Sequence, residues 1–140
     1  MIRIVARLAR RVRGRGDGGG RERLGHAGER IAARWLRRRG FRVLGRNVRI
    51  DHDEADLVVE DPDGRTVVIV EVKTRSSALH APEVRVDARK QYRLARLASK
   101  LHGRRAFADR PFRFDVVAIV WLPDGAPDVR HVPGAFEAPW

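Results

Sequence analysis

Residues 67–73 read Val-Val-Ile-Val-Glu-Val-Lys, an apolar run that ends in two charged side chains. A run this apolar is typical of an interior strand that is covered on both faces of a sheet. Because side chains alternate along a strand, Glu71 and Lys73 are expected on one face and Val72 on the other. Burying a carboxylate and an ammonium is costly unless they pair, bind a metal or take part in chemistry. The end of this strand is therefore the first candidate site.

A hairpin brings a second acidic residue to the same place. Residues 61–64 read Asp-Pro-Asp-Gly, which suits a tight reverse turn. Folding the chain back there pairs residues whose numbers sum to roughly 125 to 127, so Asp56 falls opposite Glu71 or one step away. Two carboxylates and Lys73 then converge at one end of a rigid hairpin. This arrangement predicts a site for a hard divalent cation beside a positive charge.

The composition sets limits on the class of protein. A chain of 140 residues is one domain with extensions. The absence of cysteine excludes disulfides, thiolate zinc sites and a cysteine nucleophile, and it favours a cytoplasmic protein. No apolar stretch approaches the roughly 18 residues of a membrane span, so no membrane partner is expected. A net charge of +12 and a pI of about 11.6 indicate a polyanionic partner, nucleic acid and DNA foremost, while an arginine-biased proteome explains the same charge equally well.

Half of the excess charge lies at the N-terminus. Residues 1–23 contain eight arginines against two acidic residues, a net charge of +6. We interpret this segment as a flexible Arg/Gly-rich arm that contacts phosphates without choosing a sequence, through Arg10, Arg11 and Arg13. Its glycines at 14, 16 and 19 fit G-x-G-x-x-G, but no strand precedes them, which favours a linker over a dinucleotide site.

The rest of the chain predicts alternating helices and strands. Helical spacing begins at Leu24 and ends at Gly40, and a second helix is expected over 87–101. Strands are expected over 41–47, 55–60, 66–73 and 112–122, with a loop over 76–84 and a short edge strand over 128–132. The order α-β-β-β-α-β predicts an α/β domain over 24–132 with a mixed central sheet flanked by helices, followed by a C-terminal tail over 133–140.

Several motifs occur in the order seen in the YraN-like family (UPF0102), a group of small bacterial proteins. They are GHAGE at 25–29, GF at 40–41, RN at 46–47, EADL at 54–57, VEVKTR at 70–75, Lys90 and RFDVV at 113–117. This resemblance covers residues 24–122. It implies a restriction-endonuclease-like fold with an αβββαβ core, the PD-(D/E)XK signature and a similarity to archaeal Holliday-junction resolvases. The signature proline is absent, and Asp53 stands where the family usually has glycine.

The resemblance gives the candidate residues their roles. Asp56 takes the place of the signature aspartate, Glu71 of the second acidic residue and Lys73 of the lysine. They would hold Mg²⁺ or Mn²⁺ with help from the backbone carbonyl of Val72, while Lys73 orients the attacking water. An acidic residue in the first helix of related resolvases implies Glu29 as a third ligand. The structural alternatives are a Glu71–Lys73 ion pair at a solvated strand end, a turn cap at Asp56 and an exposed first-turn glutamate at Glu29.

Lysine usage adds one more candidate. Only three of the 30 basic residues are lysines, and two of them, Lys73 and Lys90, fall at motif positions. This bias indicates a compact ammonium at Lys90, near a phosphate or the metal-bound water, and a solvated helix face is the equally weighted alternative. Arg75 and Arg113 complete the predicted nucleic-acid contacts, although Arg113 could instead pair with an acidic residue such as Asp115.

Two functions remain open from the sequence. The first is a Mg²⁺-dependent endodeoxyribonuclease, a hydrolase of phosphodiester bonds that the resolvase likeness directs towards branched DNA. Such a resolvase needs two active sites and hence a homodimer. The second is a nucleic-acid-binding accessory protein that keeps the fold and cleaves little. The intact Asp56, Glu71 and Lys73 favour the nuclease, because a retired site has no reason to keep charges in a buried strand.

Overall fold

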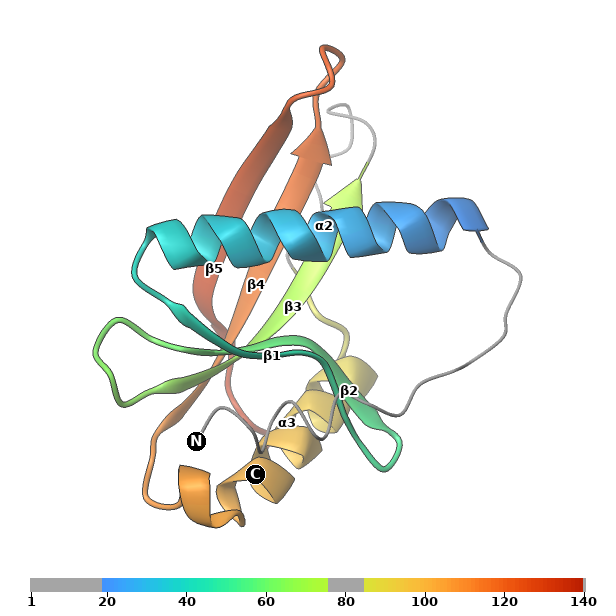
Figure 1. Cartoon of the computed structure of the whole chain (residues 1–140). Helices are drawn as coiled ribbons and strands as arrows, with labels where there is room; N and C mark the ends of the chain where they lie inside the picture. The colour runs from blue at the N-terminus through green and yellow to red at the C-terminus, as the bar shows by residue number, and fades with distance from the viewer. Residues whose placement is uncertain (1–18, 76–84, 140) are drawn as a thin grey trace.

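The computed structural model of the chain describes residues 19–75 and 85–139. They form one five-stranded sheet in the order β1-β2-β3-β4-β5, with two α-helices (Figure 1). Only β3 and β4 run parallel, and the other neighbours are antiparallel. The elements are α2 (Gly19–Arg38), β1 (Arg42–Ile50), β2 (Asp53–Glu60), β3 (Val67–Arg75), α3 (Ala88–His102), the 3₁₀ turn η1 (Arg105–Phe107), β4 (Phe112–Trp121) and β5 (Pro127–Phe136). This order confirms the predicted mixed α/β architecture.

The two helices cover opposite faces of the sheet. Val67 and Ile69 of β3 belong to the core cluster that contains the apolar face of α3, whereas Val68 and Val70 pack with Ala32 and its neighbours in α2. β3 is therefore an interior strand with both faces buried, as its apolar sequence predicted. Neither described helix is long and apolar enough to cross a membrane.

The β2–β3 hairpin fixes the level of the candidate site. Leu57 pairs with Val70 and Val58 with Ile69, which gives the sum of 127 expected from the turn. Asp63 closes the turn by accepting hydrogen bonds from the Thr66 hydroxyl and from the backbone N–H groups of Thr66 and Arg65. These bonds lower the pKa of Asp63 to about 2. One step beyond the Leu57–Val70 pair, this register sets Asp56 across from Glu71.

The helix α2 begins earlier than expected. It starts at Gly19 and not at Leu24, so the last five residues of the expected arm are helical. The glycines had been interpreted as breakers, but the first turn of a helix tolerates glycine, and the Arg-Glu-Arg sequence at 21–23 favours a helix. Residues 1–18, with Arg10, Arg11 and Arg13, lie outside the described residues, as does the expected loop over 76–84.

The strand β5 is longer than the predicted edge strand over 128–132. It runs to Phe136, so half of the expected tail belongs to the strand, and Phe136 pairs with Phe114 of β4 beyond a shift in register. Phe136 stacks on Phe114, with ring centroids 4.7 Å apart and an interplanar angle of 19°. β5 is an edge strand, where Pro133 is tolerated because one side of its backbone needs no partner.

A buried carboxylate ties the β1–β2 turn to α3. Asp53 has no exposed surface. Arg96 donates to both of its oxygens, from Nη2 at 2.7 Å and from Nε at 3.1 Å, and Lys100 Nζ donates at 3.0 Å. Burial raises the pKa of Asp53, but the hydrogen bonds and charges of Arg96 and Lys100 outweigh it and hold this pKa below its usual range. The residue that stands in place of the family's glycine is thus a fully paired structural anchor.

Replacing Arg96 with alanine should destabilise the fold. The Arg96→Ala variant leaves the buried Asp53 with Lys100 alone, and we expect the free energy of unfolding to fall by about 2 kcal/mol. Urea denaturation measures this change. Arg93→Ala, which removes an exposed arginine one turn earlier in α3, is the control and should change stability by less than about 0.5 kcal/mol. Equal effects of the two variants would show that the Asp53 network contributes no net stability.

Candidate metal centre

Two carboxylates meet at the end of the hairpin away from its turn. Asp56 lies on β2, and its Oδ2 accepts a hydrogen bond of 2.7 Å from the backbone N–H of Val72 on β3. Burial raises the pKa of Asp56 to about 7, with further raising by the charges of Glu71 and Glu29 that outweighs the lowering by the Val72 N–H and by Lys90. Asp56 is therefore about half protonated near neutral pH when no cation is bound.

Glu71 has an oxygen without a hydrogen bond. Its side chain is 17% exposed, and the buried Oε2 accepts no hydrogen bond from the described residues. Lys90 Nζ lies 3.6 Å from this atom, which is an ion-pair distance. Burial raises the pKa of Glu71 by more than Lys90 and Lys73 lower it. Such an oxygen retains the lone pairs that a cation requires.

The two lysines adjoin the carboxylates from different sides. In the described part of the chain, Glu71 forms its ion pair with Lys90 of α3 and not with Lys73. Lys73 Nζ instead donates to the backbone carbonyl of Arg85, although its charge still lowers the pKa of Glu71. The structure thus brings Lys90 to the site. The expected alternative of a Glu71–Lys73 ion pair does not form.

The strand β2 twists at Asp56. Ala55 packs in the cluster on the α3 side, whereas Leu57, two residues later, packs in the cluster on the α2 side. Regular alternation would place these two residues on the same face. At this break in the alternation, the charge of Glu29 in α2 raises the pKa of Asp56 and the charge of Lys90 in α3 lowers it.

A glycine allows α2 to carry Glu29 to the site. A Cβ at Gly28 would lie 2.4 Å from the Thr74 hydroxyl oxygen, a distance that no side chain tolerates. The helix therefore approaches β3 more closely than any other residue would permit. Glu29 follows at once, and its charge raises the pKa of both Asp56 and Glu71. Glu29 also lies 3.5 Å from His26 Nδ1. In the sequence, Gly28 stood out only as part of a motif. Its position on the apolar stripe of the first helix is the feature that would have indicated close packing.

The donor set fits a cation that keeps part of its water shell. Within residues 19–75 and 85–139, no three His, Cys, Asp or Glu side chains gather closely enough to hold a metal ion by themselves. The donors that fit are Asp56, the unbonded oxygen of Glu71 and the backbone carbonyl of Val72. Mg²⁺ typically uses one or two carboxylates and fills its other positions with water and substrate phosphate. The orphaned Glu71 oxygen is the observation that favours such an ion.

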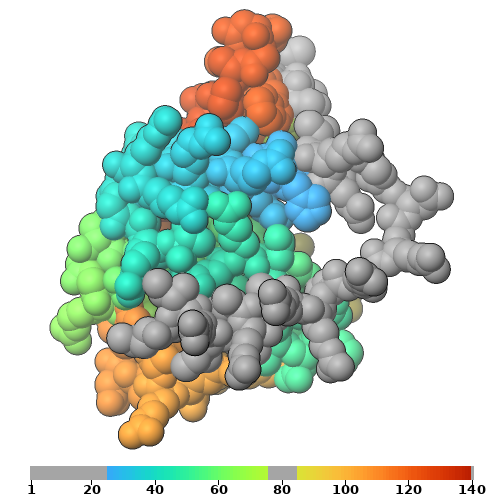
Figure 2. Space-filling view, in the orientation of Figure 1, coloured from blue at the N-terminus to red at the C-terminus, as the bar shows by residue number. Residues whose placement is uncertain are grey.

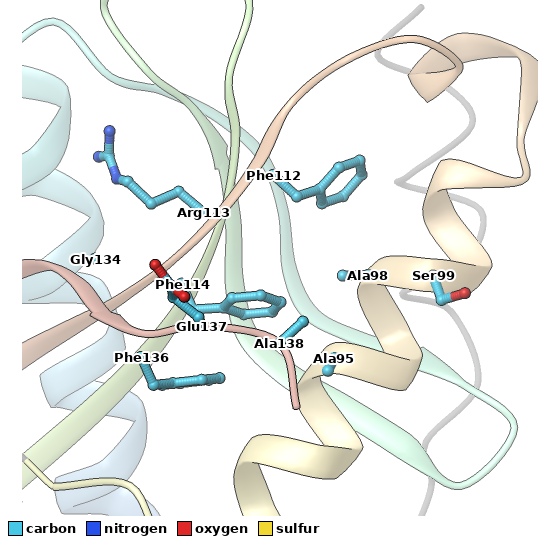
Figure 3. Close-up of a pocket in the computed structure, with 10 residues that line it drawn as sticks. All are labelled: Ala95, Ala98, Ser99, Phe112, Arg113, Phe114, Gly134, Phe136, Glu137 and Ala138. Carbon is cyan, nitrogen blue, oxygen red and sulfur yellow. The ribbon is translucent and has the colours of Figure 1, made fainter. Parts of the chain in front are cut away.

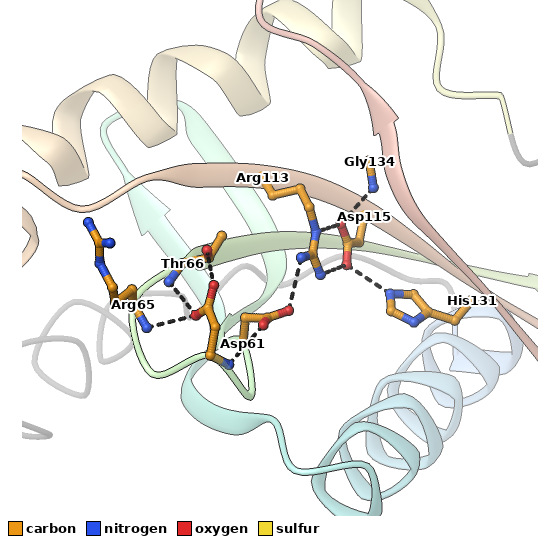
Figure 4. A network of polar contacts seen from close by, with 8 residues as sticks. Asp61, Arg65, Thr66, Arg113, Asp115, His131 and Gly134 are labelled. Carbon is orange, nitrogen blue, oxygen red and sulfur yellow. Dashed lines mark hydrogen bonds and ion pairs between the residues drawn. The ribbon is translucent and has the colours of Figure 1, made fainter.

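A second buried aspartate shows what a purely structural carboxylate looks like in this fold. Asp115 accepts hydrogen bonds from Arg113 Nε and Nη2 and from His131 Nε2, each at 2.8 Å, and from the Gly134 N–H at 3.0 Å (Figure 4). Burial raises the pKa of Asp115, but these donors hold it below its usual range. Arg113 also pairs with Asp61 at 2.9 Å. The Arg113–Asp115 ion pair is therefore present, and a nucleic-acid contact through Arg113 stays a prediction.

Two cavities flank the sheet. One of about 600 Å³ adjoins the site and is lined by residues that include Glu29. The other, of about 460 Å³, lies between α3 and the strands β4 and β5, where Phe112, Phe114 and Phe136 line it (Figure 3). None of the candidate metal ligands lines the second cavity. Arg75, the remaining predicted contact, is exposed at the end of β3.

The fold and site together define a small α/β protein with acidic and basic side chains gathered at one end of a mixed sheet. The chain belongs to the family described as "Uncharacterised protein family UPF0102", whose model matches residues 28–119. It is 44% identical to a UPF0102 protein of Anaeromyxobacter dehalogenans over 87% of this chain and 90% of the relative. It is also 44% identical to one from Symbiobacterium thermophilum, over 83% and 98% of the two chains. A relative from Geobacter sulfurreducens is 40% identical over 81% and 88%. These matches confirm the family indicated by the motifs.

Gly28→Ala should separate α2 from β3. The added methyl group would collide with the Thr74 hydroxyl, so we expect a destabilisation of about 1–3 kcal/mol in urea denaturation. In a Thr74→Ala background, the Gly28→Ala change should cost much less stability. The colliding hydroxyl is then gone, and the nearest atom that alanine keeps at position 74 is Cβ, at 3.5 Å. Additive losses in the double variant would show that this contact does not set the helix position.

The metal-free protein should lose stability as the pH rises. Folded Asp56 keeps its proton up to about pH 7, whereas the unfolded chain loses it near its ordinary pKa of 3.8. The folded state therefore binds more protons in this window, and the contribution to stability falls with rising pH by at most about 1.4 kcal/mol per unit. In EDTA, Asp56→Asn should remove this decline between pH 5 and pH 7, measured as a difference from wild type. Glu54→Gln, at an exposed position on the same strand, should keep it. Parallel profiles for wild type and Asp56→Asn would contradict the raised pKa.

Proposed function

We propose that this protein is a metal-dependent nuclease that hydrolyses phosphodiester bonds, with DNA as the foremost substrate. The observation that carries the proposal is the half-buried Asp56–Glu71 pair. Burial raises the pKa of both carboxyl groups, and the Glu71 Oε2 atom accepts no hydrogen bond from the described residues. Perturbed carboxylates of this kind gather at catalytic and metal sites more often than at structural ones. The element order and the motif positions support a restriction-endonuclease-like fold, with Asp56, Glu71 and Lys73 as its signature residues.

Each side chain has a role that its position supports. Asp56, Glu71 and the Val72 carbonyl would hold Mg²⁺ or Mn²⁺, and the charge of Glu29 acts on both carboxylates without Glu29 completing a three-acid group with them. When bound, such an ion polarises the scissile phosphate and lowers the pKa of a bound water. The chain itself supplies two ammonium groups at this place. Lys73 and Lys90 would orient the attacking water and offset negative charge on the phosphate oxygens.

One observation favours the second function, an accessory protein that binds nucleic acid and cleaves little. Lys73 Nζ donates to the backbone carbonyl of Arg85, so the fold already uses one of its three N–H donors, and it forms no ion pair with Glu71 among the described residues. The net charge of +12 suits both functions equally. Cleavage therefore has to be tested directly, on substrates that include branched DNA. Cleavage of a four-way junction would in turn call for the homodimer that a junction resolvase needs.

The test is cleavage of labelled four-way junction, flap, single-stranded and duplex DNA in Mg²⁺ or Mn²⁺. We expect Asp56→Asn and Glu71→Gln to lower the rate by at least about 10²-fold, because each removes a charged ligand without changing side-chain size. Glu54→Gln is the matched control and should cleave at the wild-type rate. Wild-type cleavage by Glu71→Gln, purified by two independent routes, would refute the assignment. Absence of cleavage by the wild type on every substrate, with binding retained, would favour the accessory function.

Lys73 distinguishes a catalyst from a binder. Lys73→Arg keeps the charge but replaces a compact ammonium with a broad planar fork, so it should lower the cleavage rate while leaving affinity almost unchanged. Single-turnover rates and fluorescence anisotropy measure the two quantities separately. A Lys73→Arg protein that cleaves as fast as wild type would show that only bulk positive charge matters at this position.

A further inference from the structure

The cavity beside the carboxylates has a polar and basic lining. Its volume is about 600 Å³, and its walls are His26, Glu29 and Arg30 of α2 and Arg46 and Asn47 of β1. This size falls in the range of roughly 300–1,000 Å³ that holds small ligands in proteins. Glu29 belongs both to this cavity and to the acidic group around Asp56. The cavity therefore shares Glu29 with the acidic group at the candidate metal centre, and none of the roles assigned so far uses its other residues.

The register of the sheet places the cavity wall next to Asp56. Arg46 pairs with Leu57 and Val48 pairs with Ala55, so Asn47 lies across from Asp56. Asn47 adopts a φ of 46°, in the left-handed region that asparagine tolerates better than most residues. A strand residue in this conformation interrupts the regular pleat, which turns an edge strand into the wall of a cavity.

The arginines of this wall differ from those that hold the fold together. Arg42, Arg96 and Arg113 form ion pairs with carboxylates. Among the described residues, Arg30 and Arg46 form no ion pair with a carboxylate. In the space-filling view, α2 and the β1–β2 hairpin meet along one face of the molecule (Figure 2). Two guanidinium groups with no carboxylate partner in the described part of the chain therefore line a cavity that also contains Glu29.

We propose that this cavity is a subsite for the sugar–phosphate backbone of a nucleic-acid strand, in which Arg30 and Arg46 bind the phosphate next to the scissile one. The inference rests on the proposed function, since it takes the phosphate at Asp56 and Glu71 as the scissile one. A guanidinium presents a planar pair of donors that matches a phosphate, and the Asn47 amide adds a neutral donor. Glu29 in the same lining repels a phosphate unless a cation is bound, which favours contact of the anionic strand with the arginines.

The cavity favours a backbone over a base as its occupant. Among the described residues its lining contains no Phe, Tyr or Trp side chain, the single ring is that of His26, and the two guanidinium groups and the Asn47 amide supply most of its donors. Contacts of this kind position a strand without reading its sequence. DNA and RNA share this phosphate chemistry, so both are tested.

The experiment measures metal-free binding. A labelled single-stranded 20-mer oligodeoxynucleotide and the oligoribonucleotide of the same sequence are titrated in EDTA at several salt concentrations. The double variant Arg30→Ala/Arg46→Ala should bind more weakly, and its slope of log affinity against log salt should be shallower by about 1.4, the value for two lost contacts to a single strand. Arg65→Ala/Arg105→Ala removes two exposed arginines away from the cavity and serves as the charge-matched control. The melting temperatures of both variants report that the fold is intact.

Each outcome decides the inference. A shallower slope in the cavity variant alone supports the subsite, and the nucleic acid that shows the larger change identifies the preferred backbone. Equal slopes for the two double variants would overturn it, as would a wild-type protein that binds neither oligonucleotide. Because no metal or cleavage enters this measurement, a subsite confirmed here alongside an inactive Asp56–Glu71 pair would refute the nuclease and leave the binding subsite standing.

Discussion

The structure depends on holding two acidic side chains, Asp56 and Glu71, half-buried and near one another. Burial alone raises both of their pKa values, and the mutual repulsion of the two charges raises that of Asp56 further. Three features of the fold maintain this unfavourable arrangement. The hairpin register sets the two strands level, Gly28 lets α2 approach β3, and the Asp53 anchor ties α3 to the β1–β2 turn.

The other buried carboxylates show that the cost at this site is specific. Asp53 receives three hydrogen bonds and Asp115 receives four, and in both cases an arginine makes a two-pronged contact. Asp56 receives one hydrogen bond, and Glu71 keeps an oxygen without any. Both structural carboxylates therefore receive a two-pronged guanidinium contact, whereas Glu71 has only an ion pair with Lys90 among the described residues. Since an unpaired buried polar group costs free energy, this contrast is the physical reason for regarding the pair as a binding site.

The sequence was informative where the determinants are local. The turn at residues 61–64 and the apolar run of β3 were sufficient to predict the hairpin and its register, because a Pro-Gly turn and a period of two act over a few residues. Lys90 and Glu29 came from the family resemblance and from lysine usage, and the structure brings both to the site. The predicted edge strand over 128–132 stopped short of the end of β5 at Phe136, because an edge strand accommodates Pro133 and Gly134, which no alternating pattern indicates. The Asp53–Arg96 anchor joins residues that are 43 positions apart, and its formation depends on the rotation of α3, which a linear pattern does not specify.

The most direct test of the account is calorimetric titration of the metal-free protein with Mn²⁺ at pH 6.5, in two buffers with different ionisation enthalpies. Asp56 is largely protonated at that pH when no cation is bound, so binding should expel a proton that the buffer takes up. We expect binding by wild type with net proton release. Glu71→Gln should lose the binding, and Asp56→Asn should lose the proton release together with most of the affinity. Mn²⁺ binding that is equal in wild type and Glu71→Gln, or no binding to wild type, would contradict a metal centre at Asp56 and Glu71.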